Sequence, residues 1–458
     1  MDHTDTTSTD SALSLWLDKP LPRYTSYPPA PFFRDDMTGK DYEQSLATLP
    51  ASQPISLYIH IPFCREMCLF CGCHTMITRR DDRIRDYLAK LALEMKLVAA
   101  ASPHKLTVSH LHFGGGTPNI LSPQDLTDLF AALRATFDFT SRSEIAMELD
   151  PRTLDDDKIA AMAKCGITRA SLGVQDFNAD VQKTVHRIQP YDMVAQTCAS
   201  LRAAKISRIN FDLMYGLPGQ TEDSVAETTR QALTLRPDRI ALFSYAHVPH
   251  FKIHQQALNA LRIPTGLERL SMERAAREIL RNAGYIEIGM DHFALPHDNL
   301  ALALHEKRLH RNFQGYTNDT APTLVALGAS AIGFTPHGYF QNEKDIGRYQ
   351  TMVANKTLPI SRGLALTAED RLRGEIIERL MCDLACDVKS ICRKHNATLD
   401  AFASTFDAMR PFEQAGLMTR KDYVITLQGP YRMAIRALAS LFDAYVQPPA
   451  SRAYSRVA

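Results

Sequence analysis

Four cysteines stand close together in the chain: Cys64, Cys68, Cys71 and Cys73. Thiolates are soft ligands that suit iron and zinc. A structural zinc site needs four ligands, commonly arranged as two well-separated pairs, and these cysteines are too crowded for that. A loop with the spacing of the first three can wrap one side of a cubane cluster and leave its fourth iron open. The spacing therefore predicts a 4Fe–4S cluster held by Cys64, Cys68 and Cys71, with a zinc site as the alternative.

Two residues beside these ligands have roles that the spacing does not fix. Cys73 is too close to Cys71 to be a relaxed fourth ligand. Phe70 precedes the third ligand and is suited to line a cofactor, although an ordinary core position is the alternative. The other five cysteines are scattered, and we expect ordinary buried residues at 165, 198, 382, 386 and 392. A disulfide framework would need an oxidising compartment and a more distributed pattern.

Short apolar runs that alternate with helical patterns must position the cysteine loop. Residues 55–63 alternate apolar and polar side chains, as a half-buried strand does, and residues 80–100 have apolar residues at helical spacing. Ser122 is suited to cap a further helix. More strands are expected at 108–113, 144–149, 169–174, 208–216 and 239–247. Six strand–helix units in series predict an α/β fold with a parallel sheet and right-handed crossovers.

The expected strands end in motifs that suit a binding site: GGGTP, DPRT and YGLPGQ. Loops at the carboxyl ends of such strands are where α/β barrels place their chemistry. Glycine lets the backbone approach a ligand closely, which fits the run Gly114–Gly116, although a simple turn is the alternative. The cysteine loop also follows a strand, so all these motifs are expected at one mouth of the barrel.

The chain is expected to divide into four parts. Residues 1–20 are polar and predicted to be disordered, and residues 21–54 form an N-terminal segment that packs on the barrel. Residues 55–357 form the barrel, and 358–458 are mainly helical with the outline of a winged-helix-like domain. That last part has no basic stripe, so a lid over the barrel is favoured over nucleic-acid binding.

The composition of the 458 residues is that of an ordinary soluble protein, with 45% hydrophobic and 22% charged residues. The net charge of +1 gives no global attraction to nucleic acid or an anionic membrane. No segment approaches the run of about 18 apolar residues that a membrane span needs. The N-terminus lacks the basic and apolar regions of a secretory signal. We expect a cytoplasmic monomer with no membrane span and no nucleic-acid partner.

The chain resembles the radical SAM superfamily, whose signature is CxxxCxxC with an aromatic residue before the last cysteine. Within it, the chain is similar to the family of oxygen-independent coproporphyrinogen III oxidases. The resemblance covers nearly the whole chain and rests on ten blocks in the same order. They are RYTSYP (23–28), LYIHIPFC (57–64), CLFCGC (68–73), HFGGGTP (112–118), ELDPR (148–152), LGVQDFN (172–178), FDLMYGLP (211–218), YAHVP (245–249), GMDHFA (289–294) and HRNFQGY (310–316).

The resemblance implies a partial (β/α)6-type barrel and a step of haem biosynthesis. The open iron would bind S-adenosylmethionine (SAM), and reductive cleavage would give a 5′-deoxyadenosyl radical that abstracts hydrogen from a substrate propionate. Loss of carbon dioxide at two propionates would convert coproporphyrinogen III to protoporphyrinogen IX. The protein's part is to hold the radical source against one C–H bond and to exclude water. An unidentified low-potential electron donor, flavodoxin- or ferredoxin-like, would be needed.

The same resemblance assigns a set of SAM contacts, and the family is thought to use two SAM molecules. The matching positions are Tyr58, Phe70, Gly115, Gly116, Thr117, Glu148, Gln175, Arg187, Asp212, Ala246 and Ile332. A carboxylate inside a barrel is costly unless it is paired, so Glu148 and Asp212 should each have a partner, from SAM or from an internal salt bridge. Arg187 is suited to neutralise a methionine carboxylate, with a solvated position as the alternative.

The substrate would carry four carboxylates, so basic residues should meet them. Arg23, His310 and Arg311 lie in family-specific blocks and are the candidates. Cys73 is expected to act in substrate or electron handling, in a role that stays open. The main competing function is a haem-binding or haem-trafficking protein of the same superfamily, which lacks the fourth cysteine and the RYTSYP segment.

Overall fold

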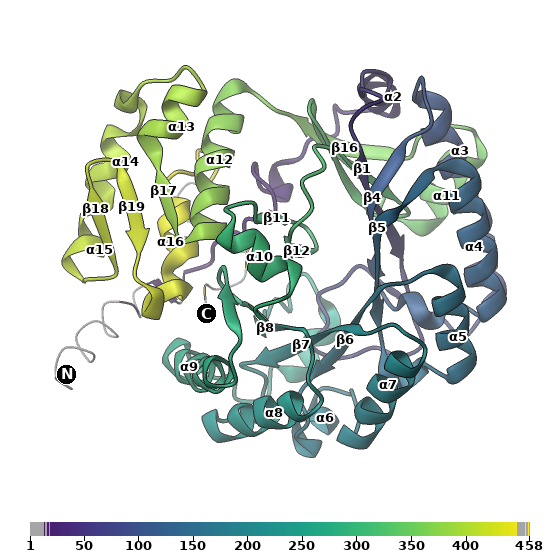
Figure 1. Ribbon diagram of the computed structural model, residues 1–458, viewed down its shortest axis with the longest axis horizontal. Coiled ribbons are helices and arrows are strands. Elements are labelled where there is room, and N and C mark those ends of the chain that lie inside the picture. The colour runs from purple at the N-terminus through teal and green to yellow at the C-terminus, as the bar shows by residue number, and fades with distance from the viewer. Residues whose placement is uncertain (1–12, 14–15, 18, 447–453, 455–456, 458) are drawn as a thin grey trace.

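The centre of the protein is a curved sheet of parallel strands (Figure 1). It is seen in a computed structural model that describes residues 13, 16–17, 19–446, 454 and 457. Six neighbouring strands run parallel in sequence order: β1 (Ile55–Ile61), β4 (Thr107–Gly115), β5 (Asp138–Leu149), β6 (Arg169–Gln175), β7 (Arg208–Tyr215) and β8 (Arg239–Ser244). The predicted α/β fold with a partial six-stranded barrel is confirmed.

Helices follow the strands and cover the outer face of the sheet (Figure 1). They are α3 (Asp81–Ala101), α4 (Pro123–Thr136), α5 (Asp156–Cys165), α6 (Ala179–Thr184), α7 (Tyr191–Ala203), α8 (Glu222–Thr234) and α9 (Gly266–Asn282). Ser122 caps α4 as predicted, because its hydroxyl accepts from the backbone N–H of Asp125 at 3.1 Å. The Asp125 carboxylate accepts in return from Ser122, which completes a capping box.

The sheet continues beyond the six predicted strands at both edges. Next to β1 stand β13 (Leu324–Leu327), β14 (Ile332–Thr335), β15 (Gly338–Asn342) and β16 (Ile360–Ala365), with α11 (Ile346–Ala354) between the last two. Next to β8 stand β10 (His292–Ala294) and β9 (Ile286–Ile288). The break that we predicted after residue 357 falls before β16, which still pairs with β15. The helical C-terminal group therefore begins at α12.

The C-terminal group lies beside the barrel and contains a small antiparallel sheet (Figure 1). Its helices are α12 (Ala368–Asp383), α13 (Val388–Lys394), α14 (Ala403–Ala408), α15 (Arg410–Gln414) and α16 (Ile435–Ser440). Its strands are β17 (Ala385–Asp387), β18 (Met418–Lys421) and β19 (Val424–Leu427), in the order β17-β19-β18. This matches the predicted winged-helix-like outline. Between this group and the barrel lie α10 (Asn299–His305), β11 (His310–Asn312) and β12 (Gly315–Thr317).

The N-terminal segment joins the two parts. Its helix α2 (Gly39–Ala47) packs on α3, and the Tyr24 hydroxyl donates to Asp443 of the C-terminal group at 3.0 Å. Most of the range 1–20, where we predicted disorder, lies outside the described residues. Within it, Leu13 and Leu17 are described and are fully buried.

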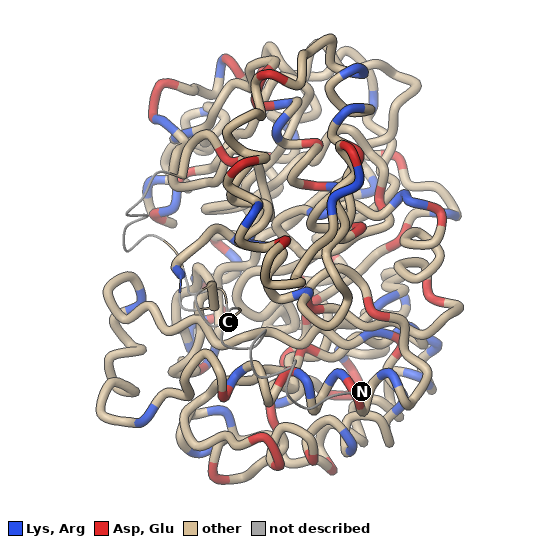
Figure 2. The backbone as a smooth tube through the Cα atoms, turned by 90° about the vertical axis from the view of Figure 1, so that its left-hand side faces the viewer, with Lys and Arg blue, Asp and Glu red and all other residues tan. Residues whose placement is uncertain are grey.

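Charge is mixed over the surface of the described chain. Figure 2 shows Lys and Arg positions interspersed with Asp and Glu positions along the tube, in keeping with the near-zero net charge. Among the described residues, no helix has the length and apolar character to cross a membrane.

Candidate functional site

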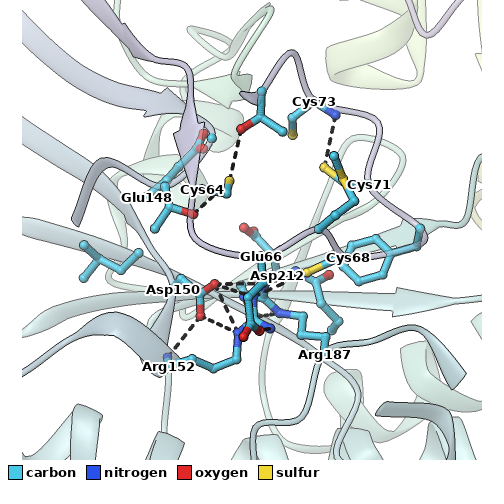
Figure 3. A pocket seen from close by; sticks show the side chains of 18 of the residues that line it. Cys64, Glu66, Cys68, Cys71, Cys73, Glu148, Asp150, Arg152, Arg187 and Asp212 are labelled. Atoms are coloured by element: carbon cyan, nitrogen blue, oxygen red, sulfur yellow. Dashed lines mark hydrogen bonds and ion pairs between the residues drawn. The ribbon is translucent and has the colours of Figure 1, made fainter. Parts of the chain in front are cut away.

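The cysteine loop stands at the carboxyl mouth of the barrel. Its two ends are joined because β2 (Phe63–Cys64) pairs with β3 (Met76–Ile77). Cys64, Cys68 and Cys71 all line one cavity of about 150 Å³, and Figure 3 shows their sulfur atoms around a common space.

Two of the three thiols receive hydrogen bonds from nearby loops. The Thr75 hydroxyl donates to Cys64 Sγ at 3.1 Å, and the Thr117 hydroxyl lies 3.2 Å from the same sulfur. The backbone N–H of Cys73 donates to Cys71 Sγ at 3.4 Å. Hydrogen bonds to ligand sulfurs stabilise the thiolate and tune the potential of an iron–sulfur cluster.

Two arginines approach the third thiol. Arg152 Nη2 and Arg187 Nη1 each lie 3.4 Å from Cys68 Sγ. Both also pair with Asp150, at 2.7 and 3.3 Å. Burial alone would raise the pKa of Asp150, but the charge of Arg187 and the hydrogen bonds from Arg152 outweigh it and lower that pKa. Arg187 is therefore not solvated; it is 10% exposed and joins a cysteine to a carboxylate.

The cysteines of the loop differ in acidity. A hydrogen bond from the Cys73 side chain, helped by the charges of Lys252 and His254, lowers the pKa of Cys71 to about 6. The same contact raises the pKa of Cys73. Burial raises the pKa of Cys64, against the hydrogen bonds from its threonine neighbours. Of the two thiols in this pair, Cys71 therefore loses its proton first, and Cys73 keeps its proton and donates it in a hydrogen bond to Cys71.

The arrangement of the thiols distinguishes a cluster from a single metal ion. In the described residues, no three His, Cys, Asp or Glu side chains converge closely enough to hold one ion. A cubane cluster does not require convergence, because each thiolate binds a different iron. Three thiols that line one cavity and receive hydrogen bonds fit a 4Fe–4S cluster, and they do not fit the zinc alternative.

Two carboxylates face the same cavity from strands β5 and β7. Glu148 lies 3.2 Å from His112 Nε2. Asp212 accepts from Ser171 at 3.3 Å and from Asn210 at 3.0 Å. Burial and the charge of Glu148 raise the pKa of Asp212 to about 7. Asp212 has neutral hydrogen-bond donors in place of the predicted salt bridge, and among the described residues Glu148 pairs with His112 at 3.2 Å, so a ligand cation would be favourable here.

The inner face of β1 leads from the middle of the barrel to the cysteine loop. Tyr58 and His60 alternate with buried apolar residues, and the Tyr58 hydroxyl lies 3.0 Å from His60 Nδ1. His60 Nε2 donates to the carbonyl of His74 at 3.0 Å. Burial lowers the pKa of His60 to about 4, so this histidine is a neutral link between Tyr58 and the loop.

The glycines that end β4 have no room for a side chain. A Cβ atom on Gly116 would lie 2.6 Å from the carbonyl oxygen of Phe63 and 2.7 Å from Thr75 Oγ1. Gly115 has a φ of 114° and lies against the His60 ring. The backbone can therefore pass close beneath the cysteine loop only with glycine at these positions.

Seven of the eleven predicted SAM positions line the cavity of the cysteine loop. They are Phe70, Gly116, Thr117, Glu148, Gln175, Arg187 and Asp212. Gly115 is adjacent to this set, and Tyr58 approaches Glu148 across Gly114. Ala246 follows β8 and Ile332 begins β14, so both lie at strand ends outside the lining of this cavity.

The three predicted substrate contacts lie outside the lining of the cysteine-loop cavity. His310 and Arg311 line a wider cavity of about 750 Å³, together with Tyr24–Tyr27 of the RYTSYP segment. Arg311 Nε donates to the backbone carbonyl of Arg23 at 3.3 Å. The Arg311 side chain is 4% exposed and packs on the Tyr316 ring at 4.4 Å. The Arg23 side chain lines a separate, smaller cavity and donates to the Ser244 carbonyl at 3.0 Å, so only His310 and Arg311 of the three share the wide cavity.

Asp150 and Arg152 are site residues that the sequence analysis did not single out. Both belong to the ELDPR block that was quoted for Glu148. The block was a signal for them, but a contact with Cys68 across 84 positions of sequence has no local pattern. Thr75, which donates to Cys64, likewise carried no signal beyond its place in the loop.

The fold and this site are those of a radical SAM protein. Residues 58–232 match the model of the radical SAM superfamily. The chain is also similar to the solved structure of coproporphyrinogen III oxidase (HemN) from Escherichia coli, described as a radical SAM enzyme. The TM-score is 0.87 at 36% identity, over 92% of this chain and 97% of that one.

Curated relatives narrow the class. The chain is 45% identical to the oxygen-independent coproporphyrinogen III oxidase of Bradyrhizobium diazoefficiens, over 93% of this chain and 95% of that protein. It is 38% identical to the enzyme of the same name from Pseudomonas aeruginosa, over 99% of both chains. The chain belongs to the family of oxygen-independent coproporphyrinogen III oxidases. These relatives give no support to the haem-trafficking alternative.

Proposed function

We propose that this protein catalyses the oxygen-independent conversion of coproporphyrinogen III to protoporphyrinogen IX, by oxidative decarboxylation of two propionate side chains. The observation that carries the proposal is the meeting of three cysteine thiols with Glu148 and Asp212 on one cavity. Full-length similarity to oxidases of that name supports the choice of substrate.

Cys64, Cys68 and Cys71 would hold the 4Fe–4S cluster. When bound, the cluster and SAM supply the electron and the carbon-centred radical that abstracts hydrogen from a propionate. Glu148 and Asp212 would bind the ammonium or ribose groups of SAM, and Arg187, 3.4 Å from Cys68 Sγ, would supply a counter-charge to that ligand. Two SAM molecules are part of the proposal, with Ala246 and Ile332 as contacts at neighbouring strand ends.

The wide cavity beside the barrel is proposed as the site of the tetrapyrrole. Its volume of about 750 Å³ suits a large substrate, and its lining offers basic side chains such as His310, Arg311 and Arg371 beside several acidic ones. Ser56 of β1 lines this cavity, and Tyr58 follows on the same face of the strand, two residues closer to the cysteine loop. This face of β1 would guide a propionate toward the cluster while the surrounding barrel excludes water.

Cytoplasmic location and a monomeric state complete the proposal. All nine cysteines are free, including the five at 165, 198, 382, 386 and 392, which are buried as predicted. Unpaired cysteines fit a reducing compartment. Size-exclusion chromatography of the purified protein tests the monomer.

The function is tested by an anaerobic assay of reconstituted protein with SAM, dithionite and coproporphyrinogen III. The expected products are 5′-deoxyadenosine, carbon dioxide and protoporphyrinogen IX, with none formed by Cys71→Ala. Formation of 5′-deoxyadenosine without release of carbon dioxide would show a radical SAM protein that acts on another substrate.

A further inference from the structure

The most exposed large apolar side chains gather around the cysteine loop. In the described part of the chain these are Ile253, Ile188 and Phe251, which are 74%, 60% and 59% exposed. Single exposed apolar residues are common, but several that flank one functional loop mark an interaction surface. The segments that carry them contact the cysteine loop directly.

The first segment lies over the second half of the loop. Phe251 and Ile253 alternate with side chains that donate to loop carbonyls: Lys252 to Cys73 at 2.8 Å, His254 to Cys71 at 2.8 Å, and Gln255 to Phe70 at 2.9 Å. The polar side chains are therefore committed to the loop. The two apolar side chains between them are left facing solvent.

The second segment, which carries Ile188, contacts the first half of the loop. The backbone N–H of Leu69 donates to the carbonyl of Val185 at 2.9 Å. Val185 and Leu69 also belong to the same apolar cluster as Leu258, which follows the first segment. The loop and both segments thus form one packed unit, with Ile188 on one flank and Phe251 and Ile253 on the other.

The two segments themselves carry basic and imidazole side chains, and acidic residues stand only at their edges. The chain contains no Asp or Glu between Arg239 and Glu268, and none from 181 to 191. Exposed basic or imidazole side chains in these stretches are Lys183, His186, His250 and Arg262. Lys183 pairs with Asp180 at 3.4 Å and Arg262 pairs with Glu268 at 2.5 Å, so the excess of positive charge comes from Lys252 and from protonated histidines. Within the loop itself, Glu66 is acidic, and it lies 3.5 Å from Arg152. An apolar centre with a charged surround is the usual design of a transient interface, and Lys252 and the histidines beside the loop favour an acidic partner.

We propose that Ile188, Phe251, Ile253 and the intervening cysteine loop are the docking surface for a small acidic one-electron carrier protein of low potential. This inference rests on the proposed function, because only a cluster-containing protein needs such a partner. The carrier loses one electron and the cluster gains it, and no bond forms or breaks. Gly72 and Cys73 are themselves exposed, so a carrier docked here comes close to the cluster. A small interface suits transient electron transfer.

The test uses holoprotein and a purified flavodoxin as the probe. Ile188→Glu and Ile253→Glu place a negative charge on the surface without altering a hydrogen bond to the loop. Leu302→Glu on α10, at a site 46% exposed, is the matched control. The dissociation constant for flavodoxin is measured by calorimetry, and the rate of cluster reduction by reduced flavodoxin is measured by stopped-flow absorbance. Reduction by dithionite is measured in parallel.

Each surface variant is expected to weaken flavodoxin binding by about tenfold and to slow reduction by flavodoxin to match. Leu302→Glu should behave as wild type, and dithionite should reduce all proteins equally. Added salt should weaken wild-type binding, because the surrounding charges are screened. Wild-type affinity in both surface variants, or no binding of flavodoxin to the wild type at low ionic strength, would overturn the proposal. A wild type that binds flavodoxin but leaves coproporphyrinogen III unchanged with dithionite would overturn the proposed function alone.

Discussion

Asp212 and Glu148 face one cavity from β7 and β5, and the charge of Glu148 adds to burial in raising the pKa of Asp212 to about 7. A raised pKa means that the ionised form of Asp212 is less stable in the folded protein than in water, so ionisation of Asp212 destabilises the fold when no ligand is present. A bound cation or ribose would favour its ionised form. This pair is therefore built for binding at the expense of stability.

Asp212→Asn should stabilise the cluster-free protein, and more so at about pH 8 than at about pH 5. The folded pKa lies above the unfolded value, so the unfolded chain releases this proton first as the pH rises, and ionisation increasingly favours unfolding until both states are ionised. The amide carries no such penalty. Thermal unfolding should show a midpoint raised by about 2–4 °C at the higher pH. The exposed Asp128→Asn on α4 serves as control. An equal effect at both pH values would contradict the assignment.

Arg152→Gln should make the reduction potential of the cluster more negative, by on the order of tens of millivolts. Arg152 brings a positive charge within 3.4 Å of Cys68 Sγ, and that charge stabilises the more negative, reduced cluster. Spectroscopic redox titration of holoprotein measures the shift. Arg65→Gln, on the cysteine loop, is the control, because the hydrogen bonds of Arg65 go to Thr78 and Asp81. An equal shift of the reduction potential in Arg65→Gln would contradict a specific effect of Arg152 on the cluster.

Glu94→Ala should destabilise the protein by about 2–4 kcal/mol. Glu94 on α3 is 1% exposed and accepts from the Gly328 backbone at 2.8 Å, and from Tyr349 and Asn342 at 2.6 Å. Removal of the carboxylate leaves three buried donors without their acceptor. The urea midpoint measures the loss, with the exposed Glu43→Ala on α2 as control. A midpoint unchanged from wild type would mean that the donors find other partners.

His310→Ala should raise the KM for coproporphyrinogen III by about tenfold, since a charge-assisted hydrogen bond to a carboxylate is worth roughly 1.5–3 kcal/mol. His310 lines the wide cavity, with a half-exposed ring 3.0 Å from Glu378. Steady-state kinetics measure KM, and SAM cleavage without substrate should be unaffected. Arg308→Ala removes a nearby exposed cation that pairs with Glu306. An equal rise in KM for both variants would indicate only a general loss of positive charge.

The parallel core was predictable because each of its six strands has a local pattern. β1 alternates polar and apolar residues, and β5 to β8 are separated by helices with clear caps. The outer strands β9, β10 and β13 to β16 are three to six residues long. Such short runs carry little periodicity, and their pairing depends on tertiary contacts that no local pattern encodes. Hence the break after residue 357 was placed one strand too early.

The cluster ligands were predictable because their spacing itself carries the chemistry. The neighbours that tune them were not. Arg152 and Thr117 reach the cysteines from other strands, so their roles depend on how the barrel closes. Arg187 was assigned by resemblance alone, and its contacts with Cys68 and Asp150 appear only in the folded chain.

The central claim is that three cysteines, and not the fourth, hold the cluster, which leaves one iron for SAM. Iron and sulfide analysis of anaerobically reconstituted variants tests it most directly. Cys64→Ala, Cys68→Ala and Cys71→Ala should be colourless and nearly free of iron. Cys73→Ala should keep wild-type iron, because alanine loses only the side-chain hydrogen bond to Cys71 and retains the backbone N–H that donates to the same sulfur. Loss of the cluster from Cys73→Ala, or retained iron in Cys71→Ala, would contradict the account.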